Sequence, residues 1–205
     1  MQALLDAALG VAHRASRGAA LAAGALVLMA AVLVSVDVLL RKFANVTLGG
    51  ADELSGYALA IGSAWSFAFV LLNRGNVRID ALYERLPRHL AALCDMLALL
   101  ALLAFVGVTA WYGAGVVEQS WRVNAHSNSA LAVPLAVPQA LWWLGYGWFV
   151  MCGLLLLLRS TLAFLLRDWA GVNRLVGARS VRDDAAEEVA AAVRAPAARH
   201  DGARP

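Results

Sequence analysis

Four long apolar stretches, separated by charged segments, constrain the fold of this chain more than any other feature. Runs without a charged residue cover positions 18–36, 54–72, 96–117 and 130–158. A helix needs about 20 mostly apolar residues to cross the hydrocarbon core of a bilayer, and all four runs are long enough. The whole chain agrees, because 61% of its 205 residues are hydrophobic and only 15% are charged. The pattern predicts an all-α integral membrane protein with four transmembrane helices.

The transmembrane helices lie within a single membrane domain, expected over residues 18–170. The fourth helix should begin near Pro138, because proline suits a first helical turn and disrupts a helix interior. The first run continues to Leu40, longer than the apolar part of a cleaved signal peptide, so we expect an uncleaved span. The four spans are placed at residues 19–40, 54–72, 93–117 and 138–158.

Arginine and lysine residues predict the orientation of these spans. If the N-terminus lies in the cytoplasm, the cytoplasmic segments up to Arg167 hold eight of these residues and the outer loops hold three. Cytoplasmic loops are enriched in Arg and Lys. We therefore expect residues 1–17 to form a cytoplasmic N-terminus. The polar, alanine-rich residues 171–205 should form a disordered cytoplasmic tail.

A compact charged insert separates the second and third spans. Within it, apolar residues recur with the spacing of one helix face, at Ile79, Leu82, Tyr83 and Leu86. Such spacing predicts a short amphipathic helix at the cytoplasmic membrane surface, ended by Pro87. An irregular solvated loop is the alternative for this insert.

Small residues repeat every four positions along the second span. The repeat consists of Gly56, Ala60, Ala64 and Ala68. In a bilayer, small residues allow helix backbones to approach closely, so this face predicts contact with another helix. The sequence does not indicate whether that helix belongs to this chain or to a partner.

Acidic residues occur near the outer ends of the first two spans. Asp37 lies four residues before Arg41, a spacing that favours an ion pair near the outer interface. Asp52 and Glu53 open the second span, where unpaired N–H groups favour acids. This pair serves as a helix start or as a contact with a partner.

The sequence lacks the patterns of catalytic, cofactor and metal sites, so we expect neither an enzyme nor a bound cofactor. It also lacks the basic, aromatic surface typical of nucleic-acid binding. An autonomous channel or carrier is one alternative, although it would need a polar stripe through several helices. A four-helix membrane assembly or signalling protein is another.

Four short motifs, in order, resemble the small membrane subunit of TRAP transporters, the DctQ-like family. Arg41 closes the first helix in DVLLRKF, and Asp52-Glu53 opens the second, although Gly50 or Ala51 replaces the usual Trp. The inner loop reads RGNVRID, in which Arg74, Gly75 and Asp80 fit and Asn76 replaces the usual His. A polar outer loop then leads into a fourth helix marked by Pro134 and Pro138.

This resemblance implies a scaffold subunit in the bacterial inner membrane. Members pair with a large permease subunit, which carries the substrate and the coupling sodium ions. A periplasmic substrate-binding protein delivers an organic acid. For this chain we therefore expect a heterodimer, and we expect the RGNVRID loop to contact the large subunit.

Overall fold

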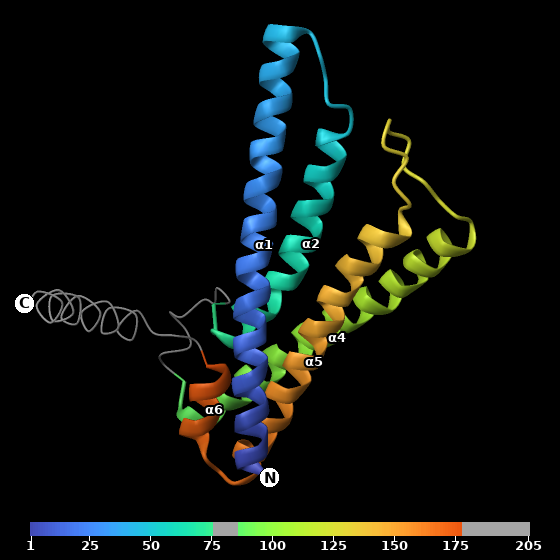
Figure 1. The fold of residues 1–205 in the computed structure, drawn as a ribbon. Coiled ribbons are helices and arrows are strands. Elements are labelled where there is room, and N and C mark those ends of the chain that lie inside the picture. Colours follow the sequence, from blue (N-terminus) through green and yellow to red (C-terminus); the bar gives the residue numbers. More distant parts are fainter. Residues whose placement is uncertain (76–85, 178–205) are drawn as a thin grey trace, which may run out of the picture.

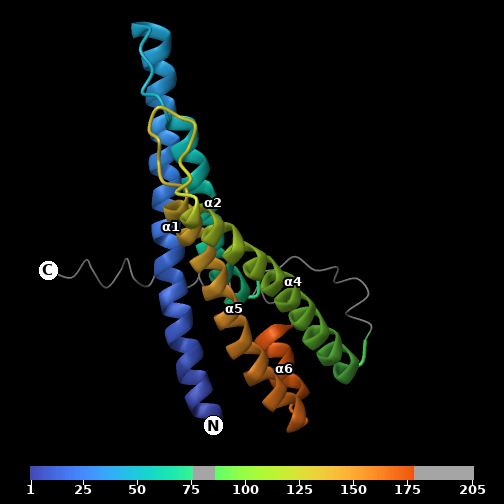
Figure 2. The same ribbon diagram turned by 90° about the vertical axis from the view of Figure 1, so that its right-hand side faces the viewer.

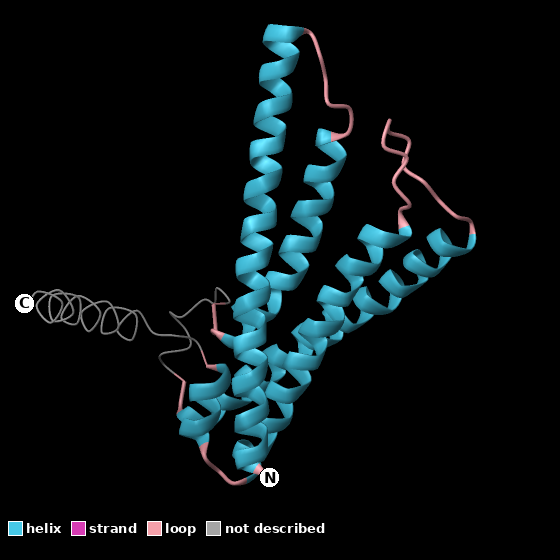
Figure 3. Cartoon of the chain, in the orientation of Figure 1, coloured by secondary structure: helices cyan, strands magenta, loops and turns pink. Residues whose placement is uncertain are grey.

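The computed structural model of the chain describes residues 1–75 and 86–177, and within these ranges the fold is helical. Four helices are long and apolar enough to cross a membrane, which confirms the predicted all-α class with four candidate spans. They are α1 (Gln2–Ala44), α2 (Ala51–Leu72), α4 (Arg88–Arg122) and α5 (Ala136–Leu165). A short helix, α6 (Trp169–Val176), follows them (Figures 1 and 3).

Each long helix is longer than the span expected from the sequence, and α1 exceeds its expected length by the most residues. At about 1.5 Å per residue, its 43 residues measure about 65 Å, roughly twice the hydrocarbon thickness. No proline interrupts residues 2–44, so the backbone hydrogen bonds continue through the polar segments on both sides of the apolar run. The helix ends where Asn45 takes a left-handed conformation, with φ of 54°.

The long helices form two antiparallel hairpins, α1–α2 and α4–α5. We call the end that carries Met1, Asn73 and α6 the N-terminal end, and the end that carries connections 45–50 and 123–135 the loop end. Helix α5 contacts α1, α2, α4 and α6, so it is the central element. The hairpins lie together toward the N-terminal end and diverge toward the loop end (Figure 1).

The buried core lies among α2, α4, α5, α6 and the first part of α1, where Ala12 is buried, and it extends from the middle of the molecule to the N-terminal end. Helix α6 lies between α4 and α5 there (Figure 2) and buries Val172 and Val176. These two residues fall in the expected tail, so packed structure continues to Val176. The core includes Ala68, Leu103, Val106, Phe149, Cys152 and Leu156.

Most of the predicted amphipathic helix lies outside the described residues. Of its apolar face, only Leu86 is described, and it is not helical. Pro87 is extended, with φ of −63° and ψ of 146°, and immediately precedes α4.

Candidate functional site

Asp37 organises the turn that joins α1 to α2. Its side chain is almost fully buried, and Arg41 donates to its Oδ2 at 2.5 Å, which confirms the predicted ion pair. Its Oδ1 accepts hydrogen bonds from the backbone N–H of Leu48 at 2.7 Å and from the hydroxyl of Thr47 at 3.0 Å. A buried carboxylate is tolerated when donors surround it, and these three donors fold residues 45–50 back onto α1.

The two acids at the start of α2 have different surroundings. Both lie in the first turn, as predicted, and Asp52 is exposed. The Glu53 carboxylate accepts a hydrogen bond from the Tyr57 hydroxyl, and the hydroxyls of Ser127 and Ser129 lie beside it. Glu53 thus connects α2 with the 123–135 connection, whereas Asp52 remains open to solvent or to a partner.

Gly50, one of the two residues that can stand in the place of the expected Trp, has a backbone conformation that favours glycine. This residue has φ of 109°, a conformation that L side chains rarely adopt. Moreover, an added Cβ would lie 2.4 Å from Cδ1 of Leu131 in the 123–135 connection. Glycine at this position therefore lets the connection pack directly over the start of α2.

The small-residue row of α2 divides into two halves. Ala64 and Ala68 are buried, whereas Gly56 and Ala60 are exposed. Ala64 faces Gly145 of α5 so closely that a Cβ added to Gly145 would lie 2.8 Å from the Ala64 Cβ. The predicted close packing is therefore filled within this chain at Ala64 and Ala68, and at Gly56 and Ala60 it stays a prediction.

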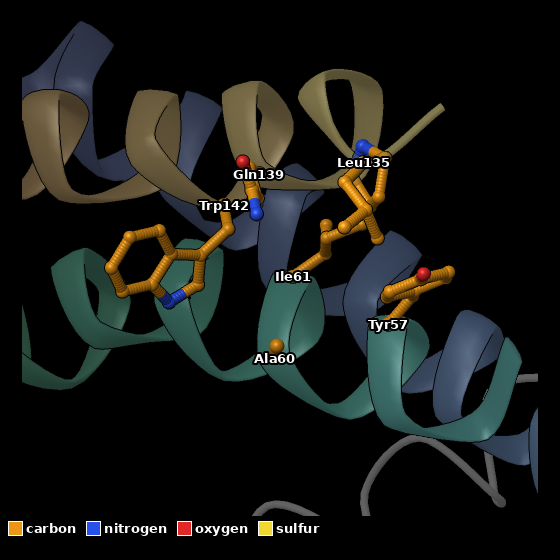
Figure 4. Close-up of a pocket in the computed structure, with 7 residues that line it drawn as sticks. Tyr57, Ala60, Ile61, Leu135, Gln139 and Trp142 are labelled. Atoms are coloured by element: carbon orange, nitrogen blue, oxygen red, sulfur yellow. The ribbon is translucent and has the colours of Figure 1, made fainter. Parts of the chain in front are cut away.

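A groove of about 160 Å³ opens beside the exposed half of the row, between α2 and the start of α5. Beyond it toward the N-terminal end, the Trp65 indole donates to the Leu141 carbonyl at 3.0 Å and joins the two helices. Figure 4 shows side chains from both helices around the groove. Its lining is Tyr57, Ala60, Ile61, Leu135, Pro138, Gln139 and Trp142.

Of the RGNVRID loop, the structure describes only Arg74 and Gly75. Arg74, two residues beyond the end of α2, has φ of 55°, and the N–H of Gly75 donates back to the Val70 carbonyl at 2.9 Å. A left-handed residue at a helix end permits such a return bond. Asn76 and Asp80 lie outside the described residues. The other motif residue, Pro134, is exposed in the 123–135 connection, where it pairs with His126.

The contacts that join the helices at the N-terminal end have no signal in the local sequence pattern. The Trp148 indole donates to the Ser16 hydroxyl at 2.9 Å, His13 Nε2 lies 3.1 Å from Asn73 Oδ1, and Arg159 donates to Asp6 at 2.7 Å. These pairs are at least 60 positions apart in the chain, so no local spacing could have revealed them.

Asp95 of α4 was also missed. It is 1% exposed and has at least one polar or electrostatic partner. Its position inside the span expected at residues 93–117 was the sequence signal that could have singled it out. Among residues 1–75 and 86–177, no group of three or more His, Cys, Asp and Glu side chains is arranged to hold a metal ion. The polar contacts described above connect helices and the segments between them.

Comparison with known families connects this architecture with a transport system. The family model described as tripartite ATP-independent periplasmic transporters, DctQ component, matches residues 30–163, well over half of the chain. The chain belongs to the DctQ family. It is thus a small membrane subunit of a TRAP transporter, a transporter component and not a member of an enzyme family. No curated protein and no solved structure matches it.

The DctQ match covers some of the contacts described above and omits others. It includes the Asp37 turn, all of α2 and α4, and the groove. It omits residues 2–29 of α1 and all of α6. Asp6, His13 and Ser16 therefore belong to a part of this DctQ protein that the family model does not describe.

Proposed function

We propose that this DctQ protein pairs with a large permease subunit to form the membrane part of a sodium-coupled transporter for an organic acid. A periplasmic binding protein would deliver that acid. The family match over residues 30–163 is the observation that carries the proposal. The described helices support it, since their many exposed apolar side chains suit lipid and a second membrane protein.

The orientation follows from the charge distribution together with the fold. The two helix connections 45–50 and 123–135 lie at the same end of the molecule, so they face one side of the membrane (Figure 1). Arg and Lys residues are fewer at the loop end than at the N-terminal end, where Arg14, Arg17 and Arg74 lie. By the positive-inside rule, we place the loop end in the periplasm of a bacterial cell and the N-terminus in the cytoplasm.

In this proposal the DctQ protein is a scaffold. Transporters bind substrate with polar groups near the bilayer midplane, often on broken helices. The long helices are continuous over their described lengths, and some of their polar groups connect one helix to another, such as the Trp65 indole with the Leu141 carbonyl and the Trp148 indole with Ser16. We therefore assign the substrate and sodium sites to the large subunit.

Reconstitution in proteoliposomes tests this function. Vesicles containing both membrane subunits, supplied with the binding protein and an inward sodium gradient, should accumulate the organic acid. Vesicles with the DctQ protein alone should accumulate none, and vesicles without it should lose most of the uptake. Flux through the DctQ protein alone would instead indicate an autonomous carrier.

A truncation separates the scaffold from an assembly or signalling protein that works through its tail. The cut should follow Gly177, because a cut at Gly171 would also remove the buried residues Val172 and Val176. A scaffold retains uptake after this truncation, whereas a protein that acts through residues 178–205 loses its activity.

A further inference from the structure

We propose that the groove between α2 and α5 at the loop end seats a membrane-spanning helix of the large permease subunit. This inference rests on the proposed function and specifies where the two subunits meet. It depends on two independent features, one on each wall of the groove: the open half of the small-residue row on α2 and the side-chain amide of Gln139 on α5.

The α2 wall already shows how such a contact is made. At Ala64, the absence of a side chain on Gly145 allows α5 to approach α2 within van der Waals distance. Ala60 and Gly56 continue the same row by one and two turns toward the loop end, but they are exposed because the hairpins diverge there. Close packing of small residues is a main source of helix association in lipid. The open half thus offers a second helix the surface that α5 uses at Ala64.

The α5 wall indicates what kind of molecule fills the groove. Gln139 extends from α5 toward α2, with its amide nitrogen on the side of Ala60 (Figure 4). Its Oε1 is covered and turned away from Ala60, whereas its N–H groups face the groove and bond to no described residue, so these N–H groups are the ones a molecule in the groove can reach. An unsatisfied amide in an apolar setting costs free energy, and an acyl chain cannot satisfy it. A helix that carries a Ser, Thr, Asn or Gln side chain at this level can.

The size of the groove fits side chains of one helix face. A cavity of about 150 Å³ holds a benzene molecule, so a groove of about 160 Å³ accepts one large or two small side chains. The partner backbone would then lie along the Gly56–Ala60 row. Tyr57 remains a fixed wall, because its hydroxyl is bonded to Glu53.

Co-purification of the large subunit with tagged Ala60→Leu tests the α2 wall. A leucine would block close approach, and overpacking costs at least about 1 kcal/mol, so retention of the large subunit should fall about fivefold or more. Ala104→Leu is the matched control, because Ala104 is an exposed alanine of α4. It should retain the wild-type amount. The melting temperature of each variant in detergent, without the partner, should match the wild type, because neither position is buried.

Gln139 tests the α5 wall and identifies the occupant. Gln139→Leu should weaken retention about threefold, the value of one hydrogen bond between helices in a membrane. A photoactivatable cross-linking residue at position 139 of the assembled complex should form a covalent adduct with the large subunit. An adduct with lipid alone, or with a second copy of this chain, would overturn the proposal.

The outcomes also separate this inference from the proposed function. If wild-type protein retains the large subunit and Ala60→Leu retains it equally well, the function stands and the groove is not the interface. If the wild type retains no large subunit, both proposals fail.

Discussion

At the N-terminal end the described side-chain hydrogen bonds that leave α1 reach α2 and α5, whereas at the loop end they reach only the turn that follows α1. The first group uses Asp6, His13 and Ser16, and the second uses Asp37. The buried core follows the same division, since it extends from the middle of the molecule to α6. Helix α1 is thus bonded to other helices at the N-terminal end, whereas at the loop end its bonded side chains hold only its own turn and Gly56 and Ala60 of α2 stay exposed.

Gly145 marks the boundary between these two regions, and its substitution should have the largest effect. Gly145→Leu places a side chain where even a Cβ would lie 2.8 Å from Ala64, so α2 and α5 must separate. Thermal unfolding in detergent should show a loss of about 3 kcal/mol in the free energy of unfolding. Gly147→Leu is the control, because no atom lies within 4 Å of its added Cβ, and it should unfold like the wild type. Equal stability of both variants would contradict the α2–α5 contact.

The loop end should respond locally to the loss of Asp37. Asp37→Ala removes the acceptor that holds Thr47, Leu48 and Arg41, so the turn should open while the core remains folded. Limited digestion with trypsin should cut after Arg41 or Lys42 several-fold faster than in the wild type. Asp52→Ala removes an exposed acid whose side chain bonds to none of the described residues and acts on Arg41 only weakly through its charge, so it should leave the digestion rate nearly unchanged.

The bond between Trp148 and Ser16 should contribute moderately to stability at the N-terminal end. One such hydrogen bond contributes about 1 kcal/mol net, and a buried group left without its partner costs about 1–3 kcal/mol. A double-mutant cycle with Ser16→Ala and Trp148→Phe should yield a coupling energy near 1 kcal/mol in detergent unfolding. A coupling energy of zero would show that this hydrogen bond does not contribute to holding α1 against α5.

The ion pair between Asp6 and Arg159 should have the smallest effect. The Arg159 side chain is 16% exposed and that of Asp6 is 52% exposed, so water reaches the pair from the Asp6 side, and exposed pairs contribute about 0.2–1 kcal/mol. Asp6→Asn should therefore lower stability slightly at low salt and not measurably at high salt, because salt screens exposed charges. Glu118→Gln, in the exposed Glu118–Arg122 pair of the loop end, is the comparison and should behave alike. A large loss at Asp6 alone would show that this bond fixes the position of the α1 N-terminus.

Local sequence patterns predicted the elements of this fold well. Length and apolarity gave the four spans, the spacing of Asp37 and Arg41 gave an ion pair that the structure contains, and the preference of acids for helix starts placed Asp52 and Glu53 in the first turn of α2. Each of these signals depends on residues a few positions apart. For that reason the sequence was sufficient to predict the spans, the ion pair and the acids at the start of α2.

The helix lengths and the arrangement of the helices were harder to predict. Hydropathy detects the segment that lies in lipid, and α1 continues beyond it because helical hydrogen bonds do not require apolar side chains. The small-residue row was visible in the sequence. The sequence did not indicate that Ala64 and Ala68 would be buried or that Ala60 would stay exposed. Which part of the row is buried depends on the angle at which the two hairpins diverge. That angle is set by contacts between helices that are far apart in the chain.

The sequence by itself determined that this chain is helical and has four candidate membrane spans. Lipid offers no hydrogen bonds to the backbone, so an apolar run of about 20 residues must form a helix to cross it. Only the tertiary structure decided which faces close on each other. Leucine and alanine gain little by leaving lipid for one another, so the choice of neighbours depends on the three-dimensional fit of surfaces such as Gly145 against Ala64.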